Sequence, residues 1–341
     1  MKYAEQLKQT SKAIVAPGKG LLAADESSGT AEKRLTSVRL VNTEENRRAY
    51  RQLLLTTDGA EKYLSGVILY DETIRQKDDS GKPFADVLKS KGIIPGIKVD
   101  MGAKDLALHD GEKMTEGLDG LRERFAEYAK LGAGFAKWRA VITIKGDELP
   151  SIACLKANAF SLALYSALAQ EVGIVPIVEP EVLLDGDHSI ERCYEASAET
   201  LQVLFKALKN QDVLLEGVIL KASMVLSGKD ASERADVQQV AEQTVKCLKE
   251  NVPAELGGVV FLSGGQTDEE ATAHLDAMNK IGGLPWPLSF SYSRAIQSEV
   301  LKLWATGDKQ KAAAAYLHRC EANSLASLGK WSEDFEKKRP Y

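Results

Sequence analysis

Residues 217–221 read Gly-Val-Ile-Leu-Lys, an apolar run that ends in a charged residue. Such a run is typical of a buried strand, and a lysine at its end must either meet a strong partner or lose its proton. An unprotonated lysine is a nucleophile. Lys98 and Lys137 close two similar runs. The pattern therefore predicts carbonyl chemistry through a Schiff base at Lys221.

Eight strand-like runs alternate with longer amphipathic stretches along the 341 residues. The runs cover residues 20–25, 63–70, 93–100, 135–142, 175–182, 216–223, 257–265 and 288–292. The amphipathic stretches include residues 44–55, 118–130, 152–171, 190–208, 231–249 and 268–280. Thr267 and Glu270 have the spacing of a capping box. Eight strand–helix units favour a closed (β/α)8 barrel over an open doubly wound sheet. The predicted fold class is α/β, a single-domain TIM barrel with extra helices and a flexible C-terminal tail.

The chain contains no Gly/Ser-rich or Pro-rich linker, so residues 1–323 are predicted to form one barrel domain. The helical pattern is lost over residues 324–341, which we interpret as a C-terminal tail. From the residue pattern alone, the terminal Tyr341 would be an ordered surface residue.

The charge balance limits the classes of partner. Lys and Arg number 44 against 49 Asp and Glu, a net charge of -5, so no general positive field attracts nucleic acid or anionic lipid. The N-terminus carries charges where a secretory signal needs an apolar core, and we expect no membrane-spanning run. Any anion binding must be local. We expect a cytoplasmic chain or the mature form of a plastid protein.

Cysteine and histidine usage gives no support for a metal site. The cysteines form no CxxC pair, which predicts buried free thiols. They are Cys154, Cys193, Cys247 and Cys320. The four histidines form no HxH or HxxxH pair. Residues 185–188, Asp-Gly-Asp-His, come nearest to a metal cluster but are ordinary turn residues. We predict that the site uses neither metal nor cofactor.

Charged residues within the runs lie at their C-terminal ends. They are Asp25, Lys98, Asp100, Lys137, Arg139, Glu179, Glu181 and Lys221. Pairs two residues apart share one face of a strand, and this end of a barrel carries the catalytic groups. The alternative is a salt-bridge layer that plugs the barrel. Eight such residues at one end favour an active site over a salt-bridge layer. In this site the charge of Lys137 would disfavour a second positive charge and help to keep Lys221 a free amine.

Two loops late in the chain have the features of a phosphate site. Residues 263–265, Ser-Gly-Gly, follow the seventh run, and Ser291 leads to Arg294 after the eighth. Glycine lets backbone N–H groups approach an anion, arginine offers a fork for phosphate oxygens, and barrels commonly bind phosphate in these loops.

A second oxyanion site could form after the first run. Ser27, Ser28 and Thr30 could act there with Arg139, although Ser27 and Thr30 could equally cap the next helix. Two phosphate sites beside a nucleophilic lysine indicate a sugar with phosphate at both ends.

Six segments carry a further signal, in order from the first run to the C-terminus. They are Leu22-Ala23-Ala24-Asp25-Glu26-Ser27, Gly96-Ile97-Lys98-Val99-Asp100, Phe135-Ala136-Lys137-Trp138-Arg139, Pro176-Ile177-Val178-Glu179-Pro180-Glu181, Leu262-Ser263-Gly264-Gly265-Gln266 and Phe290-Ser291-Tyr292-Ser293-Arg294-Ala295. These segments resemble class I fructose-bisphosphate aldolase. The resemblance implies reversible aldol cleavage of fructose 1,6-bisphosphate to dihydroxyacetone phosphate and glyceraldehyde 3-phosphate, and a homotetramer.

The resemblance also implies catalytic roles. Lys221 would attack C2 of the ketose to form the Schiff base. Glu179 would act as general acid and base, with Glu181 and Lys137 beside it. Asp25 would take the proton of the C4 hydroxyl as the C3–C4 bond breaks.

The tail and the phosphate residues receive roles from the resemblance as well. Tyr341 matches a C-terminal tyrosine that exchanges a proton at C3 of the enamine. The residues implied at the C1 phosphate are Ser263, Gly264 and Arg294, and Ser291 is expected to bind substrate. The residues implied at the other phosphate are Ser27, Thr30, Arg34, Lys98 and Arg139.

Three positions depart from the pattern of the family. Ala222 replaces a proline found in many members, Thr30 a serine found in some, and Ser293 a glycine found in some. The tail is also shorter and more basic. Two alternatives stay open: another Schiff-base barrel, either transaldolase-like or holding pyridoxal phosphate on Lys221, and a non-catalytic scaffold. The choice between fructose 1,6-bisphosphate and sedoheptulose 1,7-bisphosphate is also open.

Overall fold

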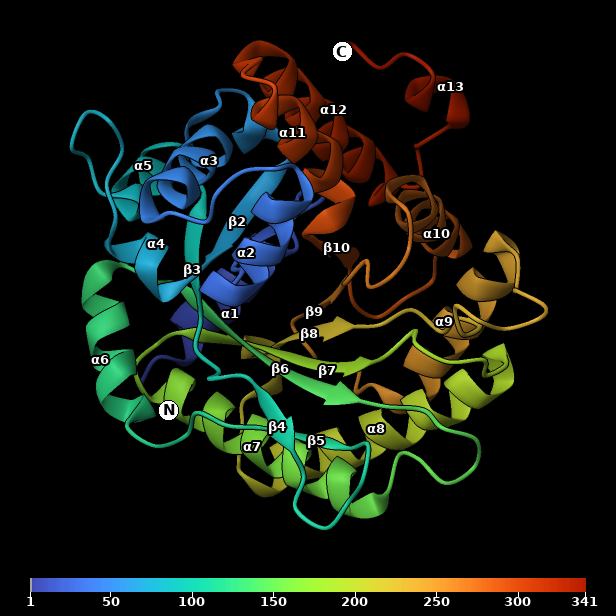
Figure 1. The fold of residues 1–341 in the computed structure, drawn as a ribbon. Helices are drawn as coiled ribbons and strands as arrows, with labels where there is room; N and C mark the ends of the chain where they lie inside the picture. The colour runs from blue at the N-terminus through green and yellow to red at the C-terminus, as the bar shows by residue number, and fades with distance from the viewer. Residues whose placement is uncertain (1) are drawn as a thin grey trace.

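The computed structural model describes residues 2–341 and contains a closed barrel of eight parallel strands (Figure 1). Around the barrel the strands are β1 (Gly20–Ala24), β10 (Leu288–Tyr292), β9 (Gly258–Phe261), β8 (Ile219–Ala222), β7 (Val175–Val182), β6 (Phe135–Ile142), β3 (Ile94–Lys98) and β2 (Leu64–Leu69). Each predicted run contains one of these strands. The predicted (β/α)8 barrel is therefore confirmed.

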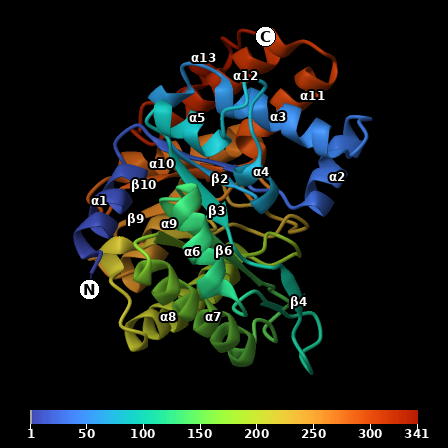
Figure 2. The ribbon, with the colours of Figure 1, turned by 90° about the vertical axis from the view of Figure 1, so that its left-hand side faces the viewer.

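Helices surround the barrel on all sides in the two ribbon views (Figures 1 and 2). They are α1 (Ala4–Ile14), α2 (Ser28–Ser37), α3 (Glu44–Thr56), α4 (Asp71–Arg75), α5 (Phe84–Ser90), α6 (Leu121–Leu131), α7 (Ile152–Glu171), α8 (Ile190–Asn210), α9 (Val237–Asn251), α10 (Asp268–Ile281), α11 (Arg294–Ala305), α12 (Lys309–Ala326) and α13 (Glu333–Glu336). Outside the barrel, β4 (Ala103–Asp105) and β5 (Lys113–Thr115) form an antiparallel pair.

Capping side chains set two of the helix starts. The predicted capping box at α10 is confirmed, because Thr267 accepts from the backbone N–H of Glu270 and the Glu270 side chain accepts from that of Thr267. The predicted start of α9 at residue 231 was wrong. Asp236 accepts from the N–H of Gln239 and closes a second capping box, so the helix begins at Val237.

The apolar core inside the barrel explains why only one end is available for chemistry. Phe135, Ile177 and Val260 point inward and form one cluster with Leu7 and Ile14 of α1. Helix α1 thus closes the N-terminal end of the barrel. A Cβ atom at Gly96 would lie 2.2 Å from the Phe135 ring, so glycine is required there for the ring to fill the interior. The C-terminal end is left for polar side chains.

Helix α7 departs from the expectation that no run approaches membrane-spanning length. Among the residues described, it is the one helix long and apolar enough to cross a membrane by length and composition. Of its apolar window, 56% is buried in the fold, where it packs against β6, β7 and α8. This burial is what a core helix of a barrel requires.

The chain after α12 is short of regular structure. Helix α12 continues through Ala326, past the predicted boundary at residue 324, and the one-turn helix α13 follows. The C-terminus lies at the outer edge of the molecule, beyond α12 and α13 (Figure 1).

Candidate active site

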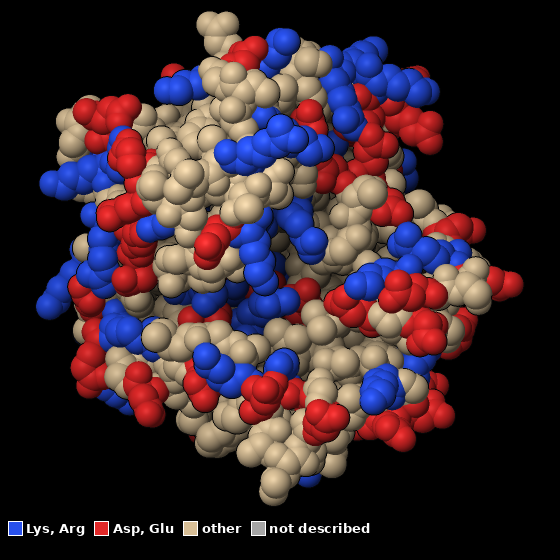
Figure 3. Space-filling model, viewed as in Figure 1, with Lys and Arg blue, Asp and Glu red and all other residues tan. Residues whose placement is uncertain are grey.

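A cavity of about 480 Å³ opens at the C-terminal ends of the barrel strands. We call it the barrel-mouth cavity. Its lining consists of Ala23, Asp25, Glu26, Ser27, Thr30, Lys33, Arg34, Ser37, Lys98, Lys137, Arg139, Glu179, Glu181, Lys221, Leu262, Ser263, Gly264, Ser291, Ser293 and Arg294. Every predicted site residue except Tyr341 is in this set. Cationic side chains outnumber acidic ones seven to four, and Figure 3 shows them gathered in the central hollow. The cavity therefore suits an anionic ligand.

Four ionisable side chains form a chain of contacts at the base of the barrel-mouth cavity. Lys137 Nζ lies 2.8 Å from Asp25 Oδ2 and 3.2 Å from Glu179 Oε2. Lys221 Nζ lies 3.0 Å from Glu179 Oε1. None of these side chains is more than 13% exposed. Acidic and basic side chains thus alternate in the order Asp25, Lys137, Glu179, Lys221, and each contacts the next.

The strand register produces this order. Residues two apart on a strand share a face, so Lys137 stands one layer above Phe135 and Glu179 one layer above Ile177. In each case the lower residue is apolar and packs inside the barrel. Lys221 follows Ile219 in the same way on β8.

Electrostatics fix the charges of three of the four groups. Burial would raise the pKa of Asp25, but the charges of Lys137 and Lys221 hold it well below its usual range. Burial would likewise raise the pKa of Glu179, and Lys137, Lys221 and Arg139 lower it instead. Burial would lower the pKa of Lys137, yet Asp25, Glu179 and Asp100 raise it. Both carboxylates are therefore ionised, and Lys137 is held as an ammonium ion.

Lys221 differs from Lys137 in having one carboxylate partner where Lys137 has two. A proton leaving Lys221 has an acceptor, Glu179, already within hydrogen-bond distance. Glu179 thus contacts both lysine nitrogens, one through each of its carboxylate oxygens.

A second layer of ion pairs lies nearer the solvent. Lys98 Nζ donates to Asp100 Oδ1 over 2.6 Å, and Arg139 pairs with Glu181. A Cβ atom at Gly264 would lie 3.1 Å from Glu181 Oε1, so Glu181 adjoins the Ser-Gly-Gly loop. Glu181 therefore contacts Arg139 and not Lys221, and its position next to the arginine makes it a support for anion binding.

The two predicted anion sites come from different loops of the lining. Ser263 and Gly264 follow β9, while Ser291 lies in β10 and Arg294 is the first residue of α11. The buried Ser291 hydroxyl has no hydrogen-bond partner, so it can take a new one from a ligand.

The loop after β1 caps a helix and also lines the cavity. Ser27 Oγ accepts from the backbone N–H of Thr30 and caps α2, and both side chains line the cavity. Lys33 and Ser37, which were not among the predicted site residues, also line the cavity. The signal was present, because residues 30, 33, 34 and 37 have the spacing of one helix face.

Glu26 and Ser293 also line the cavity and were not among the predicted site residues. Glu26 is buried and bonded to Arg34, and Ser293 Oγ donates to Glu26 Oε1 over 2.8 Å. No periodic pattern could reveal them, since they come from separate loops that meet only in the fold.

The tail places Tyr341 outside the barrel-mouth cavity. Its ring packs edge-on against His318 of α12, with 6.0 Å between ring centroids. Glu336 holds this arrangement by pairing with the buried Arg319 at 2.7 Å and with Arg339 at 2.9 Å. The reach of Tyr341 to the active site stays a prediction.

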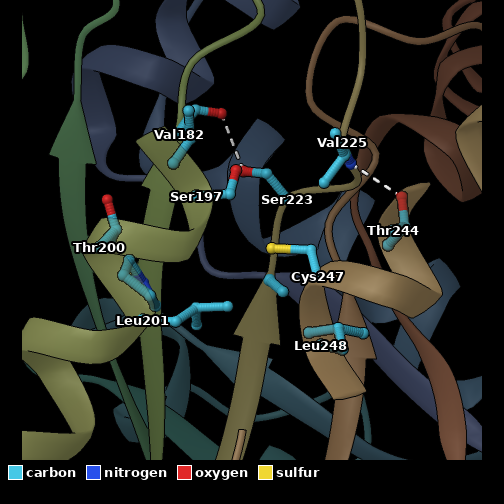
Figure 4. Close-up of a pocket in the computed structure, with 11 residues that line it drawn as sticks. Val182, Ser197, Thr200, Leu201, Ser223, Val225, Thr244, Cys247 and Leu248 are labelled. Atoms are coloured by element: carbon cyan, nitrogen blue, oxygen red, sulfur yellow. Dashed lines mark hydrogen bonds between the residues drawn. The ribbon is translucent and has the colours of Figure 1, made fainter. Parts of the chain in front are cut away.

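A second, smaller cavity lies behind β8, between α8 and α9 (Figure 4). Its volume is about 20 Å³, room for about one water molecule. Its polar atoms are already engaged, as Ser223 donates to the Val182 carbonyl and Thr244 accepts from the Val225 N–H (Figure 4). This cavity therefore has no room for a ligand larger than a water molecule.

Among residues 2–341, no group of three or more histidine, cysteine or acidic side chains is arranged to hold a metal ion. The four cysteines are buried and unpaired by disulfides.

Comparison with known proteins gives a consistent match. The family model "Fructose-bisphosphate aldolase class-I" matches residues 6–340. The chain is 61% identical over 330 residues to a protein named probable fructose-bisphosphate aldolase class 1 from Xanthomonas campestris, covering 96% of this chain and 98% of that protein. It is 51% identical to cytosolic fructose-bisphosphate aldolase 5 of Arabidopsis thaliana, covering 97% and 93%. A solved fructose-bisphosphate aldolase from Plasmodium falciparum, in complex with TRAP and an inhibitor, superimposes with a TM-score of 0.95 at 47% identity, covering 97% and 96%.

Proposed function

Because this chain belongs to the class I fructose-bisphosphate aldolase family, we propose which of its residues carry out each step of the reaction of that family. The protein is a lyase that reversibly cleaves fructose 1,6-bisphosphate to dihydroxyacetone phosphate and glyceraldehyde 3-phosphate through a lysine Schiff base. The observation that carries the assignment is the 3.0 Å contact between Lys221 Nζ and Glu179 Oε1.

Schiff-base formation moves two protons from the Lys221 nitrogen to the C2 oxygen. Glu179 accepts the first proton from Lys221, whose free amine then attacks C2 of the open-chain ketose, and Glu179 passes this proton to the C2 oxygen. Glu179 then takes a second proton from the nitrogen of the carbinolamine and gives it to the same oxygen, which leaves as water, and a protonated imine remains. Lys137 keeps its charge throughout, because Asp25 and Glu179 share it. It thereby favours the ionised form of both carboxylates.

Carbon–carbon cleavage falls to Asp25. This carboxylate is ionised, so it can take the proton of the C4 hydroxyl. The electron pair of the C3–C4 bond moves to the imine nitrogen, glyceraldehyde 3-phosphate leaves, and an enamine stays on Lys221. Tyr341 returns a proton to C3, for which the tail must leave His318. Hydrolysis of the imine then frees dihydroxyacetone phosphate and Lys221.

Two groups of side chains hold the phosphates. The C1 phosphate is assigned to Ser263, Gly264, Ser291 and Arg294, where a helix N-terminus and an unpartnered hydroxyl favour an anion. The other phosphate is assigned to Ser27, Thr30, Arg34, Lys98 and Arg139. Glu181 supports Arg139 through their ion pair.

The test is chemical trapping with dihydroxyacetone phosphate and borohydride, followed by peptide mass mapping. We expect the reduced adduct on Lys221 and none in Lys221→Met. Lys98→Met is the matched control, because Lys98 lines the same cavity but pairs with Asp100, and it should still be labelled at Lys221. An adduct on Lys98 or Lys137, or no adduct in the wild-type protein, would overturn the assignment.

We also propose that the chain forms a homotetramer in the cytoplasm. Ile152 and Phe160 of α7 are 49% and 58% exposed although they are large and apolar, which favours a covering partner of the same chain. Sedimentation should give four chains per particle, and Phe160→Asp should reduce that number if this face is an interface. A monomer in the wild type would contradict the proposal. The Arabidopsis relative is named as cytosolic, and fractionation of cells tests the location.

A further inference from the structure

Glu26 is the centre of a hydrogen-bond network in the wall of the barrel-mouth cavity. Its carboxylate receives Arg34 and Ser293 on Oε1, the latter over 2.8 Å. From behind, Arg51 Nη2 donates to Oε2 over 2.5 Å and Gln297 Nε2 to Oε1 over 3.2 Å. Arg51 and Gln297 are only 3% and 2% exposed. Glu26 is therefore anchored in the interior and presents one side to the cavity.

Ser293 uses its whole hydrogen-bonding capacity in this network. Its hydroxyl donates to Glu26 and accepts from Arg34 Nη2 over 2.9 Å and from Gln297 Nε2 over 3.1 Å. A hydroxyl has one hydrogen and two lone pairs, so each finds a partner. No capacity is left over, which means that the hydroxyl is a structural part of the site.

The network fixes the guanidinium of Arg34 at two points. Glu26 binds Nη1 and Ser293 binds Nη2. Each of these nitrogens carries a second hydrogen, and 24% of the Arg34 side chain is exposed toward the cavity. The fork is thus oriented before an anion arrives, which lowers the entropic cost of binding one.

The hydrogen bond between Ser293 and Arg34 links the two proposed phosphate sites. Ser293 directly precedes Arg294, in the loop assigned to the C1 phosphate, whereas Arg34 belongs to the group assigned to the opposite phosphate. One hydroxyl from the first site therefore holds an arginine of the second.

We propose that Ser293 is a specificity-determining residue that holds Arg34 ready for the phosphate distant from C1 and so favours ketose bisphosphates over ketose 1-phosphates. This inference rests on the proposed assignment of Arg34 to that phosphate. Ser293 acts through Arg34 and is a positioning residue.

The test compares kcat/KM for fructose 1,6-bisphosphate with that for fructose 1-phosphate. Hydrogen bonds to charged groups support a loss of about 10-fold in this ratio for Ser293→Ala, mainly through KM of the bisphosphate. Ser293→Thr keeps the hydroxyl and should recover most of the ratio. In an Arg34→Gln background, Ser293→Ala should change the ratio no further, because the group that it positions is gone.

Several results would overturn the proposal. They are an unchanged ratio in Ser293→Ala, an equal loss for both substrates, and an undiminished effect in the Arg34→Gln background. Borohydride trapping with dihydroxyacetone phosphate separates this outcome from a failure of the proposed function, since that substrate has no distant phosphate. Ser293→Ala should still be trapped on Lys221. If this variant does not fold, Ser293→Thr and Arg34→Gln still decide, since Ser293→Thr must keep a near wild-type ratio and Arg34→Gln must lower it.

Discussion

Replacing Glu179 by glutamine removes the proton acceptor beside Lys221 and keeps the shape of the side chain. The structure places Oε1 3.0 Å from Lys221 Nζ and Oε2 3.2 Å from Lys137 Nζ. Asp25 still balances Lys137 at 2.8 Å, so the variant keeps one intact ion pair in the cluster. We expect it to fold and to bind substrate.

The size of the effect follows from the number of steps that use Glu179. It takes a proton from Lys221 and later gives one to the leaving oxygen, and one positioned acid–base group contributes about 10²–10⁴-fold. We expect kcat to fall about 10³-fold, equivalent to ~4 kcal/mol in the barrier. KM should change less than about threefold, because Glu179 is not among the residues assigned to either phosphate.

Rapid quenching with borohydride measures Schiff-base formation directly. The rate of adduct formation on Lys221 in Glu179→Gln should fall by the same factor as kcat. Glu181→Gln is the matched control, since Glu181 pairs with Arg139 and should mainly raise KM. Trapping of Glu179→Gln at the wild-type rate would refute the role of Glu179 as proton carrier.

Five further outcomes are expected. Glu336→Gln leaves the buried Arg319 without its carboxylate partner and should lower the free energy of unfolding by about 3 kcal/mol in urea titration. A change below about 0.5 kcal/mol would show that the Arg319–Glu336 ion pair does not stabilise the fold. Burial would raise the pKa of Glu336, but His318 and Arg319 lower it to about 2. The contribution of ionised Glu336 to the free energy of unfolding should therefore be complete above pH ~4.5 and disappear as the pH falls through about 2. Glu336→Gln should lack this pH dependence. Burial raises the pKa of Cys247 to about 12, so iodoacetamide should modify this thiol only after unfolding, and rapid labelling of the native protein would contradict the buried position. Deletion of Tyr341 should slow proton exchange at C3 more than it raises KM, and an unchanged exchange rate would reject its role. EDTA should leave cleavage intact, because the protonated imine on Lys221 supplies the electron sink; loss of activity restored by zinc would contradict this.

The fold and the base of the site could be predicted because both depend on strand periodicity. Alternation fixes that Lys137 lies above Phe135 and Glu179 above Ile177, whatever the loops do. The closed barrel then brings the ends of its strands together. The relative positions of Lys221 and its neighbours in the site could therefore be predicted from their places on the strands.

The partners of individual charges could not be predicted in the same way. Glu181 lies two residues beyond Glu179 on β7 and pairs with Arg139, and this choice of partner depends on side-chain rotamers. Glu26 and Ser293 come from loops at opposite ends of the sequence, which carry no periodic signal. The resting place of Tyr341 against His318 depends on docking of the whole tail.

The charged cluster at the base of the barrel mouth is better explained by chemistry than by stability. Its four side chains are all at least 87% shielded from solvent, and removing ions from water costs several kcal/mol for each ion. Mutual attraction only offsets this cost, and apolar residues of similar volume are often as stable or more so. One layer below, Phe135 and Ile177 fill the barrel in that apolar way. Stability alone therefore does not require ions in the next layer, where apolar side chains could also pack. We infer that the four charged side chains are retained for the proton transfers that apolar side chains cannot perform.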